Sequence, residues 1–369
     1  MVYSAQMKKA VGALRSSLEG AGLGRQGDRF TRHGSHLPDP DAPLVLVACS
    51  GGRDSMALAS VAATVSSMLG LRCGAILIDH GLSEGSDRVS LEAAANCRKL
   101  GLDPVLVRSV QVRRTSAGLE ADAREARYEA IGEEAGHVHA SAVLLAHTMD
   151  DQAETVLIGL IRSQGLDAIT GMNHRMKRDG LDYLRPFLGL TRQETTEICR
   201  QQGLSWWDDP TNGDGFPDDQ PLPADLPLRS RVRHDLLPGL SRFAGRDMVR
   251  RLAQGADLAR RDAEYLDRQA DALADQVVMP PEPDDADQGI LARLDARSLS
   301  ARDSALRLRF LAHLLSNLGV PASSQQVESL DALASDWHGQ QGPVFPSSYS
   351  AFRKCQVILI CNDGVHANR

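Results

Sequence analysis

The most constraining segment of the sequence is the hexapeptide Ser50, Gly51, Gly52, Arg53, Asp54 and Ser55. It follows the apolar run 44–49, which predicts a buried strand, and it precedes residues 55–69, which predict a helix. Gly51 and Gly52 have no Cβ, so the backbone can adopt positive φ and approach an anion closely. The N-terminus of the next helix directs free N–H groups and a positive dipole end toward the same place. The sequence therefore predicts a phosphate-binding loop, with an ordinary glycine-rich turn as the alternative.

Apolar runs alternate with helical patterns along the first half of the chain. Strands are expected at 44–49, 73–79, 104–110 and 142–147, and helices at 55–69, 86–100, 118–135 and 150–163. Continuously apolar strands that alternate with helices indicate an α/β fold, a doubly wound parallel sheet covered on both faces. Ligands bind beyond the carboxyl ends of such strands. The segments 50–55 and 147–154 each follow a strand directly, and Asp79-His80 end a third, so we expect these segments to meet.

At 369 residues the chain exceeds one typical domain. We expect an N-terminal helix and loop, an α/β nucleotide-binding domain, a flexible insertion, an arginine-rich helical region, a linker and a small α+β tail, at 1–41, 42–213, 214–228, 229–279, 280–289 and 290–369. The helical region is expected to run from about 236 to 278, and the tail to hold helices at 299–318 and 324–336 and a strand at 357–360.

Several classes of protein are excluded by composition. No apolar run reaches the roughly 18–20 residues that span a bilayer, and residues 1–18 predict an amphipathic helix, not a signal peptide. None of the six cysteines forms a CxxC pair, so neither a zinc knuckle nor an iron–sulfur cluster is indicated. We expect a cytoplasmic protein with no membrane contact. The net charge of −7 argues against nucleic-acid binding over the whole surface, although the arginines of 229–268 could form one basic face.

Three carboxylates crowd the start of the helix that follows His147. Asp150, Asp151 and Glu154 are partly explained as residues that stabilise the helix dipole. However, Asp151 and Glu154 are i, i+3 neighbours that repel each other unless a cation lies between them. A magnesium ion or a substrate ammonium group would meet that need.

Two arginines share one side of the helix expected at 118–135. Arg124 and Arg127 are i, i+3 neighbours, and they could form salt bridges within the helix, for example to Glu120. Alternatively they form a pair of guanidinium groups for a phosphate or nucleotide, with Tyr128 as a packing residue.

The order of the motifs is specific. SGGRDS, LIDHGLS (77–83), AREARY (123–128), AHTMDDQAET (146–155), LRPFLGLTRQE (184–194) and WWDDPTN (206–212) precede the arginines of 229–233. Over residues 42–240 the chain resembles the tRNA(Ile)-lysidine synthetase family of the PP-loop ATP pyrophosphatases. That family uses ATP to adenylate the C2 oxygen of the wobble cytidine in a CAU anticodon. Free lysine then displaces AMP, and lysidine forms.

The resemblance implies roles for the candidate residues. Residues 50–55 would bind ATP, and Asp54 with Asp151 would hold Mg²⁺. Asp150, Asp151 and Glu154 would form an acidic site for L-lysine, and His147, with a pKa near neutrality, would accept a proton from its amine. Arg124 and Arg127 would grip the cytidine or the transferred phosphoryl group. The tRNA would be contacted by Arg229, Arg231 and Arg233, and by the 229–279 region as a whole. No stable protein partner is expected, although a homodimer is possible.

The chain departs from the family pattern at a few positions. His147-Thr148 stands where the family has His-His, Arg229-Ser230 stands for Arg-Asn, and the stretch 212–227 is an insertion. Three other classes of protein share parts of this pattern. A tRNA-thiolating ATP pyrophosphatase would need cysteines near the loop, an amide-forming synthetase would usually bring a glutaminase domain, and a non-catalytic RNA-binding protein would not need the intact loop and carboxylates.

Overall fold

The computed structural model describes residues 3–31, 37–79, 86–110, 112, 115, 118–209, 212–213, 215–217 and 220–365. The LIDHGLS motif beyond Asp79 and part of the WWDDPTN motif lie outside these residues. The chain divides into two compact units, Met1–Arg260 and Arg261–Arg369, and the boundary in the sequence falls within helix α9 (Met248–Asp271). The finer domain boundaries expected from the sequence remain predictions.

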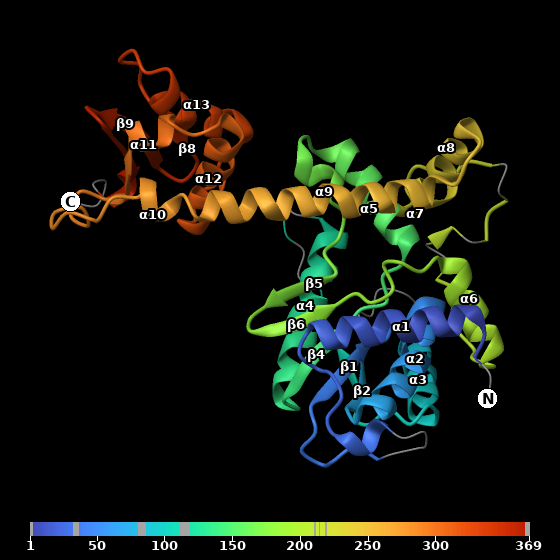
Figure 1. Ribbon diagram of the computed structural model, residues 1–369. Helices are drawn as coiled ribbons and strands as arrows, with labels where there is room; N and C mark the ends of the chain where they lie inside the picture. Colours follow the sequence, from blue (N-terminus) through green and yellow to red (C-terminus); the bar gives the residue numbers. More distant parts are fainter. Residues whose placement is uncertain are drawn as a thin grey trace. The chain divides into compact units, whose positions relative to one another are not determined.

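A six-stranded sheet organises the first unit (Figure 1). Its strands are β1 (Leu44–Ala48), β2 (Arg72–Asp79), β3 (Val105–Ser109), β4 (Ala140–Leu144), β5 (Arg175–Arg178) and β6 (Leu181–Leu184). The order is β3-β2-β1-β4-β6-β5, with all neighbours parallel except the β5–β6 hairpin. The expected parallel sheet is confirmed, together with all four of its predicted strands.

The β5–β6 hairpin was not predicted. Its turn residues Asp179 and Gly180 both have positive φ, 50° and 83°. Asp-Gly between two strands is the preferred sequence of a tight two-residue hairpin. The signal was therefore present, but the polar strand Arg175–Arg178 does not have the apolar character by which the other strands were recognised.

Alternate residues of each strand pack on opposite faces of the sheet. On one face, Val45 and Val47 join a core with α1 (Ala5–Gly20), α2 (Arg53–Leu69), α3 (Ser86–Lys99) and α6 (Arg192–Gln201). On the other face, Leu44 and Leu46 pack with α4 (Leu119–His137). This two-sided burial explains why the strands read as continuous apolar runs. It also confirms the doubly wound fold.

A second group of helices lies beyond the sheet. Helix α5 (Met149–Arg162) packs through Ala153 and Leu157 against Val232 and Leu237. These last two belong to a continuous helical stretch formed by α7 (Leu228–Arg231), the π-helix η4 (Val232–Leu236) and α8 (Leu237–Ala244). The helical region expected over about 236–278 is present, and it is divided at Gly245, whose φ of 62° ends α8 before α9 begins. Short 3₁₀ turns occur at Asp28–Thr31 and Leu166–Ile169.

The second unit is built on an antiparallel sheet of order β7-β10-β9-β8. Its elements are α10 (Ala274–Val277), β7 (Ile290–Asp295), α11 (Ala296–Ser300), α12 (Ser304–Asn317), α13 (Ser324–Ser335), β8 (Val344–Phe345), β9 (Tyr349–Lys354), β10 (Val357–Asn362) and η5 (Asp363–Val365). The helix expected over 299–318 is divided, and α12 starts after its N-cap Asp303. The predicted tail strand is β10, the central partner of β7 and β9.

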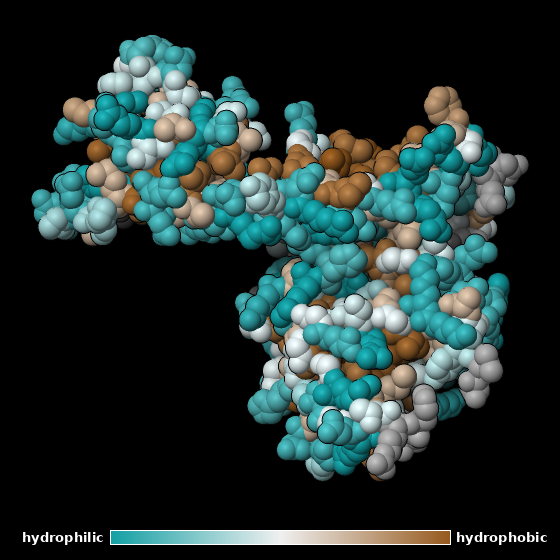
Figure 2. Space-filling view, in the orientation of Figure 1, coloured by the Kyte–Doolittle hydropathy of each residue, from teal (hydrophilic) through white to brown (hydrophobic). Residues whose placement is uncertain are grey.

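Most of the surface shown in Figure 2 is hydrophilic, and hydrophobic residues gather beside α9. Within the described ranges, no helix has the length and apolarity needed to span a bilayer.

The turn from β1 into α2 depends on one glycine with a left-handed backbone. Gly51 has φ 80°, and a Cβ there would lie 3.1 Å from Ala93 Cβ on α3. Gly52, by contrast, has φ −76° and is the N-cap of α2. The expectation that both glycines adopt positive φ is therefore correct only for Gly51.

This difference predicts unequal effects of two alanine substitutions. Gly51→Ala should lower the free energy of unfolding by about 1–2 kcal/mol, since a left-handed conformation is costly for a residue with a Cβ. Gly52→Ala should be close to neutral, because its Cβ would meet only ordinary contacts, at 3.5 Å or more. Urea unfolding of both variants measures the difference. Equal losses of stability would contradict the assigned turn geometry.

Candidate active site

The loop after β1 is held by its own serines. Ser55 Oγ donates to the Gly52 carbonyl at 2.9 Å and accepts from the Ser50 backbone N–H at 3.2 Å. Gly52 N–H donates to Ser50 Oγ at 3.4 Å, and Trp207 N–H donates to the Gly51 carbonyl at 3.0 Å. The N-cap Gly52 has no side chain to cover the end of α2. The loop is therefore fixed beside an uncapped helix N-terminus, which suits an anion.

Asp54 lies in the first turn of α2 and faces α6. Thr195 Oγ1 donates a hydrogen bond to it, and Arg192 Nε lies 3.7 Å from Asp54 Oδ2. Burial raises the pKa of Asp54 to about 6, and the negative charge of Asp151 adds to this effect although Arg192 opposes it. A carboxylate with a raised pKa gains from any cation brought next to it.

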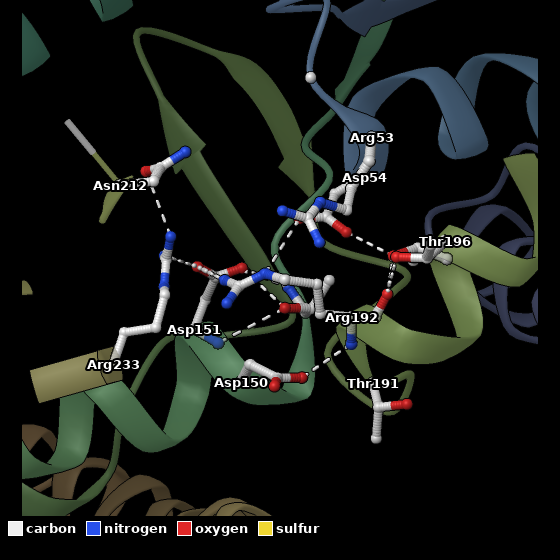
Figure 3. Close-up of polar contacts among 12 residues, drawn as sticks. Arg53, Asp54, Asp150, Asp151, Thr191, Arg192, Thr196, Asn212 and Arg233 are labelled. Atoms are coloured by element: carbon white, nitrogen blue, oxygen red, sulfur yellow. Dashed lines mark hydrogen bonds and ion pairs between the residues drawn. The ribbon is translucent and has the colours of Figure 1, made fainter. Parts of the chain in front are cut away.

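Arg192 links the phosphate loop to helix α5 (Figure 3). Besides Asp54, its guanidinium contacts Asp151 at 3.5 Å and Glu154 at 3.4 Å. Its side chain is only 14% exposed. Asp150 holds the same residue from another side, because Asp150 Oδ2 accepts the Arg192 backbone N–H at 2.8 Å. Asp150 therefore fixes the start of α6 in this structure.

Glu154 is completely buried and is paired with three arginines. Arg233 donates to both of its carboxylate oxygens, at 2.6 and 3.1 Å, and Arg229 and Arg192 each lie at 3.4 Å. Arg233 also donates to Asn212 Oδ1 at 3.2 Å. The cation that Asp151 and Glu154 were expected to require is thus provided by the protein itself. Their proximity alone does not demand a metal ion or a lysine.

Asp151 both caps helix α5 and interacts with the charged side chains around it. It forms a capping box with Thr148, accepting the Thr148 backbone N–H at 2.8 Å. Burial alone would raise the pKa of Asp151, but Arg192, His147, Arg233 and the bond from Thr148 hold it at about 2. Thr148 stands where the resembling family has a second histidine, and here it caps α5.

The pKa expected for His147 is wrong. Burial, with the nearby charges of Arg185, Arg124 and Arg229, lowers the pKa of His147 to about 4, although Asp151 opposes the shift. Its Nδ1 is buried without a hydrogen-bond partner among the described residues. The imidazole is therefore neutral at pH 7 and can accept a proton, but it is a weaker base than the sequence suggested.

Arg124 and Arg127 are close to each other on α4. The Arg124 guanidinium lies 5.2 Å from the Tyr128 ring centroid, and Tyr128 packs edge-on against Tyr183 in the core. The pKa of Arg127 is lowered by desolvation and by the charge of Arg124. Two guanidinium groups that repel each other favour a nearby anion.

The three arginines expected to act together point to different places. Arg229 and Arg233 are four residues apart and both reach Glu154. Arg231 lies between them in sequence and lines a separate pocket. Residues four apart share a helix face whereas residues two apart do not, so spacing alone could have separated Arg231 from the other two.

Two site residues were missed by sequence reasoning, Arg192 and Thr195. Thr191 and Glu194 form the capping box that opens α6. Arg192 is a cation in the first turn of that helix, where the dipole disfavours positive charge. A cation at this end of a helix needs a carboxylate to compensate it. This requirement is the signal by which the sequence could have linked Arg192 to the acidic residues of the site.

The lowered pKa of His147 predicts a pH dependence of stability. The ordinary pKa of a histidine is 6.5, and that of His147 in the folded protein is about 4. Between these two pH values, the unfolded chain binds a proton at this side chain that the folded protein does not. Stability from this group is therefore lost as pH falls through that window. His147→Asn should show a shallower loss of unfolding free energy from pH 7 to 4 than the wild type. An NMR titration that places the His147 pKa near 6.5 would contradict the environment described.

Known proteins resemble this chain along its whole length. The PP-loop domain family matches residues 28–240. The tRNA(Ile)-lysidine synthase of Bifidobacterium animalis subsp. lactis is 52% identical, with 100% of this chain and 98% of that protein covered. The same enzyme of Bifidobacterium longum subsp. infantis is 50% identical, with both chains fully covered. The Streptomyces coelicolor enzyme is 42% identical over 87% of this chain and 86% of its own. The chain therefore belongs to the tRNA(Ile)-lysidine synthase family, whose PP-loop domain here carries the loop at 50–55 and the charge cluster beside it.

Proposed function

We propose that this enzyme ligates free L-lysine to C2 of the wobble cytidine in the CAU-anticodon isoleucine tRNA, with conversion of ATP to AMP and pyrophosphate. The observation that carries the proposal is the bridge made by Arg192. It joins Asp54 of the phosphate loop to Asp151 and Glu154 of α5. The loop proposed to hold the nucleotide and the carboxylates proposed to hold the cationic amine are thereby in electrostatic contact.

The first half-reaction is adenylation. The C2 oxygen of cytidine attacks the α-phosphorus of ATP, the bond to the β-phosphate oxygen breaks, and pyrophosphate leaves with its electron pair. Residues Ser50 to Ser55 and the N-terminus of α2 would hold the phosphates. Arg124 and Arg127 would stabilise the charge of the transferred group or hold the cytidine nucleotide.

Magnesium fits the donor chemistry of Asp54 and Asp151. Mg²⁺ commonly binds one or two carboxylates together with phosphate oxygens, and burial has raised the pKa of Asp54 in a way that a nearby cation would reverse. When bound, the ion would neutralise charge that develops on the phosphates. Asp54 and Asp151 would hold it in place of their contacts with Arg192.

The second half-reaction requires a charge exchange within the cluster. Asp54, Asp151 and Glu154 are balanced by Arg192, Arg229 and Arg233, so a lysine cation has no unbalanced carboxylate to bind. The polyphosphate of ATP offers the arginines an alternative partner. Arginines that turn toward it would leave Asp151 and Glu154 to the lysine ammonium. This order would link lysine binding to a bound nucleotide.

Bond formation with lysine then completes the reaction. The ε-amine attacks C2, AMP leaves with the C2 oxygen, and the nitrogen gives up a proton. His147 is the candidate acceptor, neutral at pH 7 because its pKa is lowered. Cys49, Cys97 and Cys199 lie near the loop but are buried, which suits packing better than sulfur transfer. The reaction would take place in the cytoplasm, with no stable protein partner other than a second copy of this chain in a homodimer.

The proposal is tested with ATP, labelled lysine and an unmodified CAU-anticodon tRNA, followed by digestion to nucleosides. The wild type should produce labelled lysidine. Asp54→Asn should lose at least tenfold in AMP formation, equivalent to about 1.4 kcal/mol in barrier height, because it removes the carboxylate next to the phosphate loop.

Asp87→Asn is the matched control, since Asp87 is an exposed carboxylate in the first turn of α3. It should retain full activity. Absence of labelled lysidine from the wild-type digest would overturn the proposed function, and full activity of Asp54→Asn would remove Asp54 from the site.

A further inference from the structure

A pocket lies beside the helical segment that supplies Arg229 and Arg233, on the face that does not carry these two arginines. Its cavity of about 350 Å³ lies among α5, the 221–224 loop and the α7–η4 segment. We call it the Arg231 pocket, and it is lined by Ile161, Pro221, Leu222, Ala224, Leu228, Arg231, Val232, Asp235 and Leu236. None of these residues takes part in the charge cluster around Glu154.

Arg231 gives the pocket an unused hydrogen-bond donor. Its Nε is buried and has no hydrogen-bond partner among the described residues. Asp235 is four residues further on, yet no ion pair joins the two within the described part of the chain. Asp235 instead accepts the Leu222 backbone N–H at 3.2 Å and contacts His234 at 2.8 Å. A buried donor without a partner is costly, so a ligand that brings an acceptor would be stabilised here.

The charged and apolar side chains that line the pocket determine which chemical class of ligand it suits. One arginine and one aspartate leave the pocket without net charge, and a phosphate entering it would meet the Asp235 carboxylate. Apolar side chains from Ile161, Leu228 and Leu236 form much of the wall. A flat, uncharged group with ring-nitrogen or carbonyl acceptors suits this combination, since a guanidinium can donate to such acceptors or stack on the ring.

The surroundings of the pocket are basic. Residues 228–251 carry seven arginines and two aspartates, in a chain of net charge −7. Arg242 and Arg246, at the far end of α8, are exposed. A basic surface around an uncharged pocket matches a nucleic acid, whose phosphates remain outside while a base enters.

We propose that the Arg231 pocket binds an unpaired nucleobase of the RNA substrate, other than the base that reacts. The inference rests on the proposed function, since it takes the bound RNA to be the substrate. Arg229 and Arg233 adjoin the reacting site whereas Arg231 faces away from it, so the two bases lie on opposite sides of one helical segment. The second base therefore belongs to the same loop of the RNA.

Binding of RNA hairpins that carry the CAU anticodon loop tests this assignment. Each unpaired position except the reacting cytidine is made abasic in turn, and affinities are measured for the wild type and for Arg231→Met. One abasic position should weaken wild-type binding about tenfold, in the range of a single base contact. Arg231→Met should bind the intact hairpin about tenfold more weakly than the wild type does. Its affinity should not fall further when the same position is made abasic.

Arg246→Leu is the matched control for charge. It should weaken binding to every hairpin and reduce the salt dependence, while remaining sensitive to the abasic position. Ala224→Trp, at the exposed rim, fills the pocket without altering Arg231 and should reproduce the Arg231→Met result. It keeps the test valid if Arg231→Met unfolds.

Two outcomes would overturn the assignment. One is that each abasic position lowers the affinity of Arg231→Met by the same factor as that of the wild type. The other is that Ala224→Trp binds the intact hairpin with unchanged affinity. Lysidine formation by the wild type is measured separately. Its absence would reject the proposed function, whereas its presence with either overturning outcome would reject only this pocket.

Discussion

The buried carboxylate of Glu154 is the constraint on which the arrangement of the site depends. A fully buried charge is tolerated only when it is paired and hydrogen-bonded. Glu154 meets this condition through arginines from two distant segments, Arg192 on α6 and Arg229 with Arg233 near residue 230. Removing one partner of such a group leaves a buried charge unbalanced. The charge cluster therefore holds the elements of the candidate site together.

Apolar packing and capping place these charges. Ala153 and Leu157 on α5 pack against Val232 and Leu237, which sets the helical stretch around residue 232 against the side of α5 that carries Glu154. Thr148 and Asp151 cap α5, and Asp150 holds the first residue of α6. Carboxylates that the sequence assigned to the helix dipole or to a bound cation thus also have specific structural partners. Substitutions at Asp150 or Asp151 will change both the geometry and the charge of the site.

The parallel sheet and the phosphate loop could be predicted because their signals are local. An apolar run followed by SGGRDS predicts both a strand and a turn, and strand β1 and helix α2 lie where they were expected. The pairing of Arg192 with Asp54 could not be predicted in the same way, since the two lie 138 positions apart in the sequence and only the fold brings them together. The pKa of His147 likewise depends on burial and on Arg185, Arg124 and Arg229, none of which is its neighbour in sequence.

The central claim is that Arg192 joins the phosphate loop and α5 into one electrostatic unit. An NMR titration of Asp54 and Asp151 in Arg192→Met, compared with wild type and with Arg200→Met on the exposed side of α6, tests it most directly. Because Arg192 lowers the pKa of both carboxyls, both pKa values should rise in Arg192→Met and neither should change in Arg200→Met. If only one of the two carboxyls responds, or neither does, Arg192 does not connect the two halves of the site.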